Sequence, residues 1–406
     1  MRNFSTFTSE SVSEAHPDKV CDQISDAILD AAFRADKASR VAVECLIKEN
    51  TLVVAGELTT RANLGYEEIK NTAVDVLKKV GYNRENGFDT DGFTLISRLT
   101  GQSGEIGKAV DNTNGSPEES NFGAGDQGMM FGYASMDTEN FEGMQGMYMP
   151  APIAFAHALM RKHAEVRESE LGELRPDAKC QLSFQYDNGQ PSNIATIVLS
   201  TQHDSSYTDE RGQLKEGIPE VIKEKIIYPV IPEGLRKKTR YFINPSGAWE
   251  AGGPQVDCGL TGRKIIVDTY GGAALHGGGA LSGKDPTKVD RSAAYAARHA
   301  AKNVVAAGLA RECEIQVSYA IGEPYPTSVA VNTFGTHSPD ISQDRLAEAI
   351  EKVFDFSVRG IIDQLNLREQ EYLPTAAFGH FGRNNGEFSW ERTDKIEELK
   401  AAIKDA

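Results

Sequence analysis

The sequence has no excess of positive charge, few aromatic residues and few cysteines. Its 406 residues include 43 lysines and arginines against 59 aspartates and glutamates, which gives a formal net charge of −16. Phosphate backbones and anionic lipid headgroups require a basic protein face, so this balance argues against a general binder of nucleic acid or membranes. Any anionic ligand must be held by a local basic pocket.

The five cysteines are scattered along the chain, without a C-x-x-C pair or the Cys/His spacing of a zinc site. They predict neither a disulfide framework nor structural zinc, and they favour a reducing compartment. No run of about 18 apolar residues occurs. The amino terminus also lacks the basic stretch and apolar core of a secretory signal. We therefore expect a cytoplasmic protein without a membrane span.

An order of helix, hairpin and helix recurs three times along the chain, as apolar spacing and β-rich runs around turns indicate. The expected elements are a helix at 17–35, strands at 40–47 and 51–58 and a helix at 67–80; a helix at 153–167, strands at 179–186 and 193–200 and a helix at 219–227; and a helix at 292–309, strands at 312–321 and 327–333 and a helix at 343–354. Each unit would place helices on one face of a mainly antiparallel sheet, and the remaining faces must be buried. This predicts an α+β protein that oligomerises.

The densest functional signal is a glycine-rich segment at 276–285, HGGGALSGKD, followed by Lys288 and Asp290. Glycines let backbone N–H groups close on an anion, Lys284 and Lys288 supply cationic donors, and Asp290 can hold a divalent metal. These features predict a polyphosphate cradle. It is not a Walker A loop, because Asp285 follows the lysine where that motif requires Ser or Thr. A flexible glycine turn is the alternative interpretation.

Three shorter motifs add charged and glycine residues. DCGLTGRK at 257–264 precedes a strand-like run at 265–268, and its basic pair Arg263 and Lys264 is either a ligand contact or solvated surface charge. SESVSEAHPDK at 9–19 approaches a helix, so it is either a capping region or a binding segment. GAGDQG at 123–128 allows a tight turn that carries an acid and an amide.

Together these segments resemble the signatures of the S-adenosylmethionine synthetase family, in that family's order. The resemblance runs from Thr8 to Arg383 and includes GELTT, RPDAK and LSTQH. It implies three similar α/β-sandwich domains with mainly antiparallel sheets, related by a pseudo-threefold axis. It also implies a homodimer or homotetramer with active sites between subunits. The implied division is an N-terminal domain at 1–104, a mobile loop and linker at 105–120, a central domain at 121–249, a C-terminal domain at 250–392 and a tail at 393–406.

The reaction that the resemblance implies joins ATP and L-methionine. The methionine sulfur attacks C5′ of ATP directly to form S-adenosylmethionine, and the released triphosphate is hydrolysed to pyrophosphate and phosphate. A thioether has no proton to lose, so the first step requires alignment and stabilisation of the leaving group rather than a general base. The resemblance further implies two magnesium ions per site and one potassium ion per subunit.

The resemblance also assigns roles to individual residues of this sequence. The implied catalytic residues are His16, Asp126, Lys179, Arg263 and Lys284. The implied ATP contacts are His16, Asp177, Lys179, Ala248, Trp249, Asp257, Arg263, Lys264, Ala280 and Lys284. The implied methionine contacts are Glu57, Gln102, Asp257 and Lys288. Asp18 and Asp290 would bind magnesium, and Glu44 would bind potassium.

The sequence departs from the family pattern at a few positions. Ala248-Trp249 stands where the family usually has Arg-Phe, so a cation is lost while a larger aromatic face, able to stack on adenine, is kept. Leu281 replaces a usual Phe. Gly104 replaces a usual Pro in the loop expected from Gln102 to about 112, which makes that loop more flexible. Two other functions stay open: another ATP-dependent kinase or ligase, and a catalytically weak paralogue.

Overall fold

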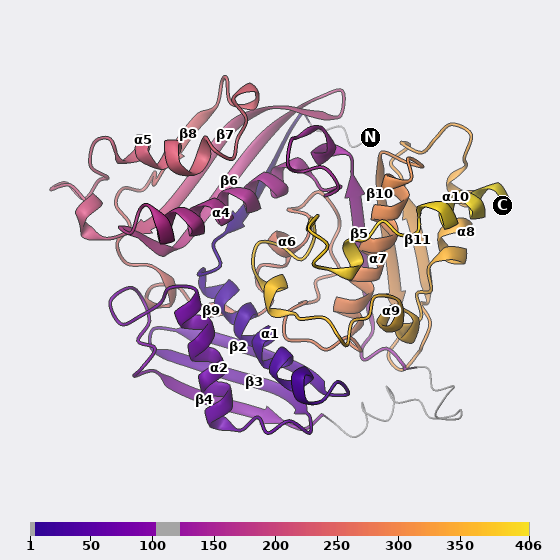
Figure 1. The fold of residues 1–406 in the computed structure, drawn as a ribbon, viewed down its shortest axis with the longest axis horizontal. Helices are drawn as coiled ribbons and strands as arrows, with labels where there is room; N and C mark the ends of the chain where they lie inside the picture. Colours follow the sequence, from indigo (N-terminus) through magenta and orange to yellow (C-terminus); the bar gives the residue numbers. More distant parts are fainter. Residues whose placement is uncertain (1–4, 103–121, 406) are drawn as a thin grey trace.

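The structure is a computed structural model that describes residues 5–102 and 122–405. Three sheets, each covered by helices, surround a central region that contains the short helix α6 (Ile265–Asp268) (Figure 1). The first sheet has the order β4-β3-β2-β9. Its strands and covering helices are α1 (Pro17–Ala35), β2 (Arg40–Lys48), β3 (Thr51–Thr59), α2 (Tyr66–Lys79), β4 (Thr94–Thr100) and β9 (Gly259–Leu260).

The other two sheets repeat this plan. The second has the order β1-β6-β7-β8 and comprises β1 (Thr6–Val12), α4 (Ala151–Ser169), β6 (Leu174–Asp187), β7 (Gln190–His203), α5 (Ile218–Ile222) and β8 (Arg240–Ile243). The third has the order β11-β10-β5 and comprises β5 (Gly128–Ser135), α7 (Val289–Ala306), β10 (Glu312–Tyr319), β11 (Ser328–Asn332), α8 (Gln343–Val353), α9 (Val358–Gln364) and α10 (Ile396–Asp405).

Short helical turns connect these elements. A π-helical turn at Lys223–Ile227 continues α5, and the 3-10 turns are Asp137–Asn140, Ser205–Tyr207, Glu233–Leu235, Gly253–Gln255, Leu373–Ala376 and Ser389–Glu391. Most strand pairs are antiparallel, and the exceptions within the described sheets are β3 with β4 and β7 with β8. The predicted α+β class with mainly antiparallel sheets is therefore confirmed. Among the described helices, none combines the length and apolar character needed to cross a membrane.

The helix–hairpin–helix order predicted for each unit is present, but one prediction from the sequence is wrong. The run at 265–268, expected as a strand, is the helix α6. The Asp268 N–H donates to the carbonyl oxygen of Lys264, and the buried Asp268 carboxylate pairs with the Lys19 ammonium. Burial of this charged pair at the centre of the molecule outweighs the β propensity of the three apolar residues before Asp268.

One strand of each unit pairs with the sheet of a neighbouring unit. β1 precedes α1 in the chain but pairs with β6, β5 precedes α4 but pairs with β10, and β9 pairs back with β2. The long helices α1, α4 and α7 pack on both their own sheet and a strand of this kind. The exchange runs from first unit to second, second to third and third to first. No sheet in the described chain is therefore completed by its own unit alone.

Helix α1 carries an aspartate at every fourth position. Residues spaced by four lie on one face of a helix, and here all four carboxylates are buried. Each accepts backbone N–H groups from a segment far away in the sequence. The pairs are Asp18 with Leu260 at 2.9 Å, Asp22 with Gly262 at 2.8 Å, Asp26 with Gly283 at 2.8 Å and Asp30 with Tyr372 and Leu373 at 2.8 Å each. This face of α1 therefore fixes the glycine-rich loops.

The buried His163 of α4 gives a testable pH dependence. Burial, assisted by Arg167, lowers its pKa from 6.5 to about 3, and its Nε2 lies 2.7 Å from the Thr201 hydroxyl. Below pH 6.5 the imidazole of His163 is protonated in the unfolded chain but stays neutral in the folded chain. The contribution of the buried neutral His163 to the free energy of unfolding is therefore fully present above pH 6.5 and is lost as the pH falls towards 3. The unfolding free energy of the wild type should therefore drop relative to His163→Gln by about 1.4 kcal/mol per pH unit.

Urea unfolding of both proteins at pH 7.5, 6.5, 5.5 and 4.5 measures this difference. His337→Gln, at a partly exposed position, serves as the control for loss of an imidazole. A difference between wild type and His163→Gln that does not change with pH would contradict the assignment.

Candidate active site

The first cluster of charged residues surrounds Asp18 in the first turn of α1. Asp18 is fully buried, with Arg263 Nε 2.9 Å from Oδ1 and Lys264 Nζ 2.5 Å from Oδ2. Burial alone would raise the pKa of Asp18, but the hydrogen bonds from Lys264 and from the Leu260 N–H outweigh it and lower the pKa. Arg263 and Lys264 are therefore not merely solvated surface charge. They converge on one buried carboxylate.

His16 caps α1 and also faces the cluster. Its Nδ1 accepts a hydrogen bond from the Asp18 N–H at 3.2 Å, and its Nε2 lies 4.0 Å from Asp257 Oδ2. Burial, followed by the nearby Lys264 charge, lowers the pKa of His16 to about 3. The imidazole is therefore neutral, with its proton on Nε2. The capping interpretation of the 9–19 motif is therefore confirmed, and the binding interpretation stays a prediction.

Strand β6 brings Asp177 and Lys179 to the same place. Lys179 lies opposite Val12 in the β1–β6 register, and Val12 precedes His16 by four residues. Asp177 is buried and accepts from the Gly253 N–H at 2.9 Å. Burial raises the pKa of Asp177 to about 6, against the opposing effects of the Gly253 N–H and the Lys179 charge. The segment at 248–253, which begins with Ala248 and Trp249, is therefore joined to the first cluster at Gly253.

The second cluster forms on the glycine-rich loop and α7. Lys284 Nζ lies 2.6 Å from Asp290 Oδ2, and Lys288 Nζ lies 2.7 Å from the buried Asp285 carboxylate. The loop packs tightly, since a Cβ added at Gly279 would lie 2.1 Å from Asp290 Oδ1. A Cβ added at Gly277 would lie 1.7 Å from the Met129 carbonyl oxygen. Glycine is required here for close approach, so the loop is not simply a flexible turn.

Four other predicted residues lie on β2, on β3, after β4 and before β5. The exposed Asp126 follows Gly125, whose N–H donates to the Thr287 carbonyl at 3.2 Å beside Lys288. Glu57 lies opposite Ala42 in β2, and Ala42 also bridges to Lys284. Gln102 donates its N–H to the Thr59 hydroxyl at 2.9 Å, at the end of β3. Glu44 is exposed on β2, two residues from Ala42.

Strand β2 sets the spacing of the two clusters. Leu260 pairs with Leu46 at one end of β2, and Lys284 bridges to Ala42 at the other. Four residues of strand place these pairings about 13 Å apart. The two loops approach each other in between, because a Cβ at Gly262 would lie 2.4 Å from the Ala280 Cβ. Within residues 5–102 and 122–405, no ion pair joins a side chain of one cluster to a side chain of the other.

The sequence predictions missed the residues behind the clusters. Lys19 is buried between Asp22, at 2.9 Å, and Asp268. Arg291 pairs with both oxygens of Asp26, at 2.6 and 2.9 Å. The aspartates at positions 18, 22, 26 and 30 were a readable signal, because a repeat of four acids on an otherwise buried helix requires partners. Gly104 and the loop and linker expected at 105–120 lie outside the described residues.

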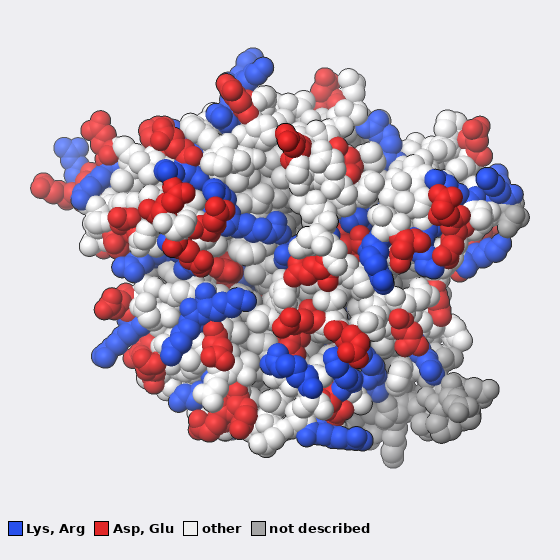
Figure 2. All heavy atoms as spheres, viewed as in Figure 1, with Lys and Arg blue, Asp and Glu red and all other residues white. Residues whose placement is uncertain are grey.

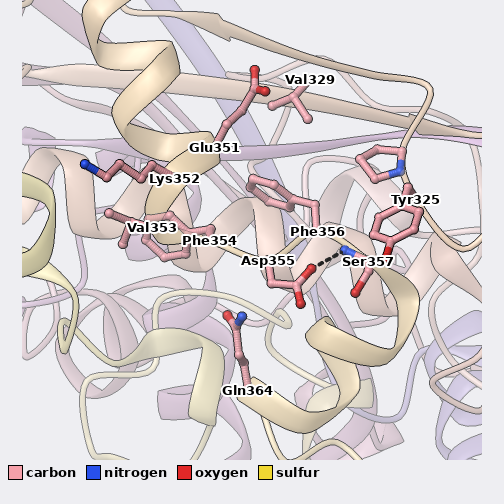
Figure 3. A pocket seen from close by; sticks show the side chains of 11 residues that line it. Tyr325, Val329, Glu351, Lys352, Val353, Phe354, Asp355, Phe356, Ser357 and Gln364 are labelled. Carbon is pink, nitrogen blue, oxygen red and sulfur yellow. Dashed lines mark hydrogen bonds between the residues drawn. The ribbon is translucent and has the colours of Figure 1, made fainter. Parts of the chain in front are cut away.

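The described surface shows no single charged region in one view, and it has a cavity away from both clusters. Figure 2 shows acidic and basic side chains interspersed over the helix-covered side, so the net charge is not concentrated in one region of that view. A cavity of about 360 Å³ lies between α8, α9 and the β10–β11 turn and is lined by Tyr325, Phe354, Asp355 and Gln364 among others (Figure 3). None of the predicted site residues lines this cavity.

Two lysine- and carboxylate-bearing clusters on glycine-lined loops define a class of protein that binds a polyphosphate. Family models match nearly the whole chain: the S-adenosylmethionine synthetase N-terminal domain at residues 4–104, the central domain at 121–249 and the C-terminal domain at 251–392. The chain therefore belongs to the S-adenosylmethionine synthetase family. The three domains identify it as a transferase, and they support ATP binding and, in general terms, methionine adenosyltransferase activity.

Gly279→Ala tests the packing of the second cluster. The backbone at Gly279 is one that alanine can adopt, but the new Cβ displaces Asp290 and breaks its contact with Lys284. We expect the KM for ATP to rise about tenfold or more, the equivalent of one charged hydrogen bond. Initial rates and thermal unfolding are measured together. Gly172→Ala, whose Cβ would meet no atom within 4 Å, is the matched control, and equal KM values for both variants would refute the assignment.

Proposed function

We propose that this chain forms S-adenosylmethionine by direct attack of the methionine sulfur on C5′ of ATP and then hydrolyses the triphosphate. The character of the first cluster supports this proposal. It offers cations and hydrogen-bond donors, and its imidazole is a poor base, because the pKa of His16 is lowered to about 3 and Nδ1 already accepts a hydrogen bond. A kinase or ligase would usually need a base for its acceptor.

The first step requires no proton transfer. The sulfur lone pair forms the S–C5′ bond, the C5′–O bond breaks, and its electron pair stays on the triphosphate oxygen. Our assignment gives Arg263, Lys264, Lys179 and Lys284 the stabilisation of that developing charge, with His16 donating from Nε2. Asp126 then lies by the methionine sulfur or amino group.

The second step retains the triphosphate in the same cationic surroundings. A water oxygen attacks phosphorus, one P–O–P bond breaks, and the water proton leaves to solvent or to a phosphate oxygen. Charge neutralisation and alignment are the main requirements of such a hydrolysis. One set of lysines can therefore serve both steps.

The proposed substrate contacts are those that the family resemblance implies. ATP is assigned to the first cluster, to Ala248 and Trp249, and to Ala280 and Lys284 on the glycine-rich loop. Methionine is assigned to Glu57, Gln102, Asp257 and Lys288.

The carboxylates fit magnesium by their chemistry. In the described part of the chain, no group of three or more His, Cys, Asp or Glu residues is arranged to hold a metal. Mg²⁺, however, usually binds through one or two carboxylates together with substrate phosphates. Asp18 and Asp290 would fit this mode as single carboxylates close to the lysines that would face the substrate phosphates. Bound magnesium would supply further charge neutralisation, with two ions per site, and Glu44 would contribute to a potassium site.

We further propose that the enzyme is a homodimer or homotetramer in the cytoplasm. The outer face of the first sheet supports an interface, because the apolar side chains of Leu46, Val53 and Ala55 are only partly buried there and Ile96 is 39% exposed. A half-apolar sheet face of this kind is usually covered. The separation of the two clusters agrees with a site that pairs the first cluster of one subunit with the second cluster of its partner.

Complementation of two variants tests this arrangement. Lys264→Met disables the first cluster and Lys284→Met the second, so each variant alone should be nearly inactive. If each site combines both subunits, a mixed dimer regains one intact site, and random mixing restores about a quarter of wild-type activity. Co-expression with two affinity tags and a product assay measures this. Activity that stays at the level of the single variants would place both clusters of a site in one chain.

The stoichiometry of products tests the reaction itself. Purified protein with ATP, methionine, magnesium and potassium should yield S-adenosylmethionine, pyrophosphate and phosphate in equal amounts, since each turnover releases one of each. Omission of methionine is the control. Consumption of ATP without the sulfonium product would favour a kinase or ligase, and complete inactivity would favour the weak-paralogue alternative.

A further inference from the structure

The end of strand β7 holds the segment at 249–253 through two side chains. The His203 N–H donates to the Trp249 carbonyl at 3.0 Å, and the Trp249 N–H donates to His203 Nε2 at 2.9 Å. The Gln202 side chain donates to the Glu250 carbonyl at 2.9 Å. An imidazole thus takes the place of a backbone carbonyl and extends the strand pairing onto a loop.

The hydrogen bonds of His203 determine its protonation state. Nδ1 lies 2.8 Å from the Asp204 carbonyl oxygen, which can only accept, so Nδ1 carries the proton. Nε2 is then the acceptor that the Trp249 N–H requires. His203 is completely buried, and both of its ring nitrogens are occupied. The residue does not face the clusters itself, so any effect on the reaction must pass through Trp249.

The loop transmits this constraint to the indole ring. Trp249 Nε1 donates to the Ala251 carbonyl at 2.7 Å, which ties the ring to its own backbone, while the residue remains partly exposed. Two residues further on, the Gly253 N–H donates to Asp177 in the first cluster. The segment is therefore held at both ends, by His203 at Trp249 and by Asp177 at Gly253.

We propose that His203 is a positioning residue that sets the indole of Trp249 for contact with the purine base of ATP. This inference rests on the proposed function, which assigns Trp249 to the nucleotide. His203 fixes the backbone N–H of Trp249, and the indole, bonded to the same loop, follows. Loss of the Nε2 acceptor frees that N–H and the ring with it. The effect falls on nucleotide binding rather than on methionine.

Two substitutions separate positioning from folding. His203→Leu removes the acceptor, whereas His203→Gln keeps an amide oxygen at a similar distance from the backbone. We expect the KM for ATP to rise about tenfold in His203→Leu, comparable to the loss of one base stack. The KM for methionine and kcat should stay within about twofold, because those contacts are unchanged. His203→Gln should restore most of the ATP affinity.

Tryptophan fluorescence gives a readout that a purely structural role would not change. The chain has two tryptophans, and Trp390 is fully buried between Tyr295 and Phe388. A change in emission on addition of adenylyl imidodiphosphate should therefore come from Trp249, and Trp249→Leu gives the background. If His203 acts through the indole, His203→Leu adds nothing to the loss already caused by Trp249→Leu.

The outcomes distinguish this inference from the proposed function. If the wild type shows no binding of the nucleotide, the proposed function fails. If the wild type binds while His203→Leu binds equally well, or if the two substitutions weaken binding additively, the role of His203 is wrong. Failure of His203→Gln to recover affinity while its fold is intact would likewise overturn it.

Discussion

The buried acidic face of α1 is the constraint on which the rest of the structure depends. Aspartates spaced by four residues repel one another, and burial makes each charge costly unless it is paired. Arg263 and Lys264 compensate Asp18, Lys19 compensates Asp22, and Arg291 compensates Asp26. The cations come mostly from remote segments, so the loops of the site can be placed only when α1 is in place.

Asp30, at the end of this face, shows the cost of burial more directly. Its carboxylate accepts two backbone N–H groups, from Tyr372 and Leu373, yet burial still raises its pKa to about 7. At Asp18 the balance is reversed, since charged hydrogen bonds outweigh the same burial. The pKa is therefore raised at Asp30, which mainly anchors the chain, and lowered at Asp18, which holds two cations at the candidate site.

The sequence was sufficient to predict the repeated units, because apolar periodicity and hairpin turns are local signals. It was insufficient at 265–268, where three apolar residues suit a strand and only the distant Lys19 explains the helix. It also did not predict the strands β1, β5 and β9, each of which pairs with a strand of another unit, and a period of two would identify such a strand but not its partner. Motifs indicated the candidate site residues, whereas the separation of these residues into two clusters depends on the pairing of β2 with Leu260 and with Lys284.

The ion pairs of the two clusters bear on how the proposed reaction is prepared. Lys264 and Arg263 contact Asp18, and Lys284 contacts Asp290, so the cations that would neutralise a triphosphate are already held in place by carboxylates. Preorganisation of this kind reduces the reorganisation needed in the transition state. It also means that a phosphate must compete with Asp18 and Asp290 for these side chains. A cation bound at each carboxylate would relieve that competition, and this is the role that the proposed magnesium binding at Asp18 and Asp290 would have.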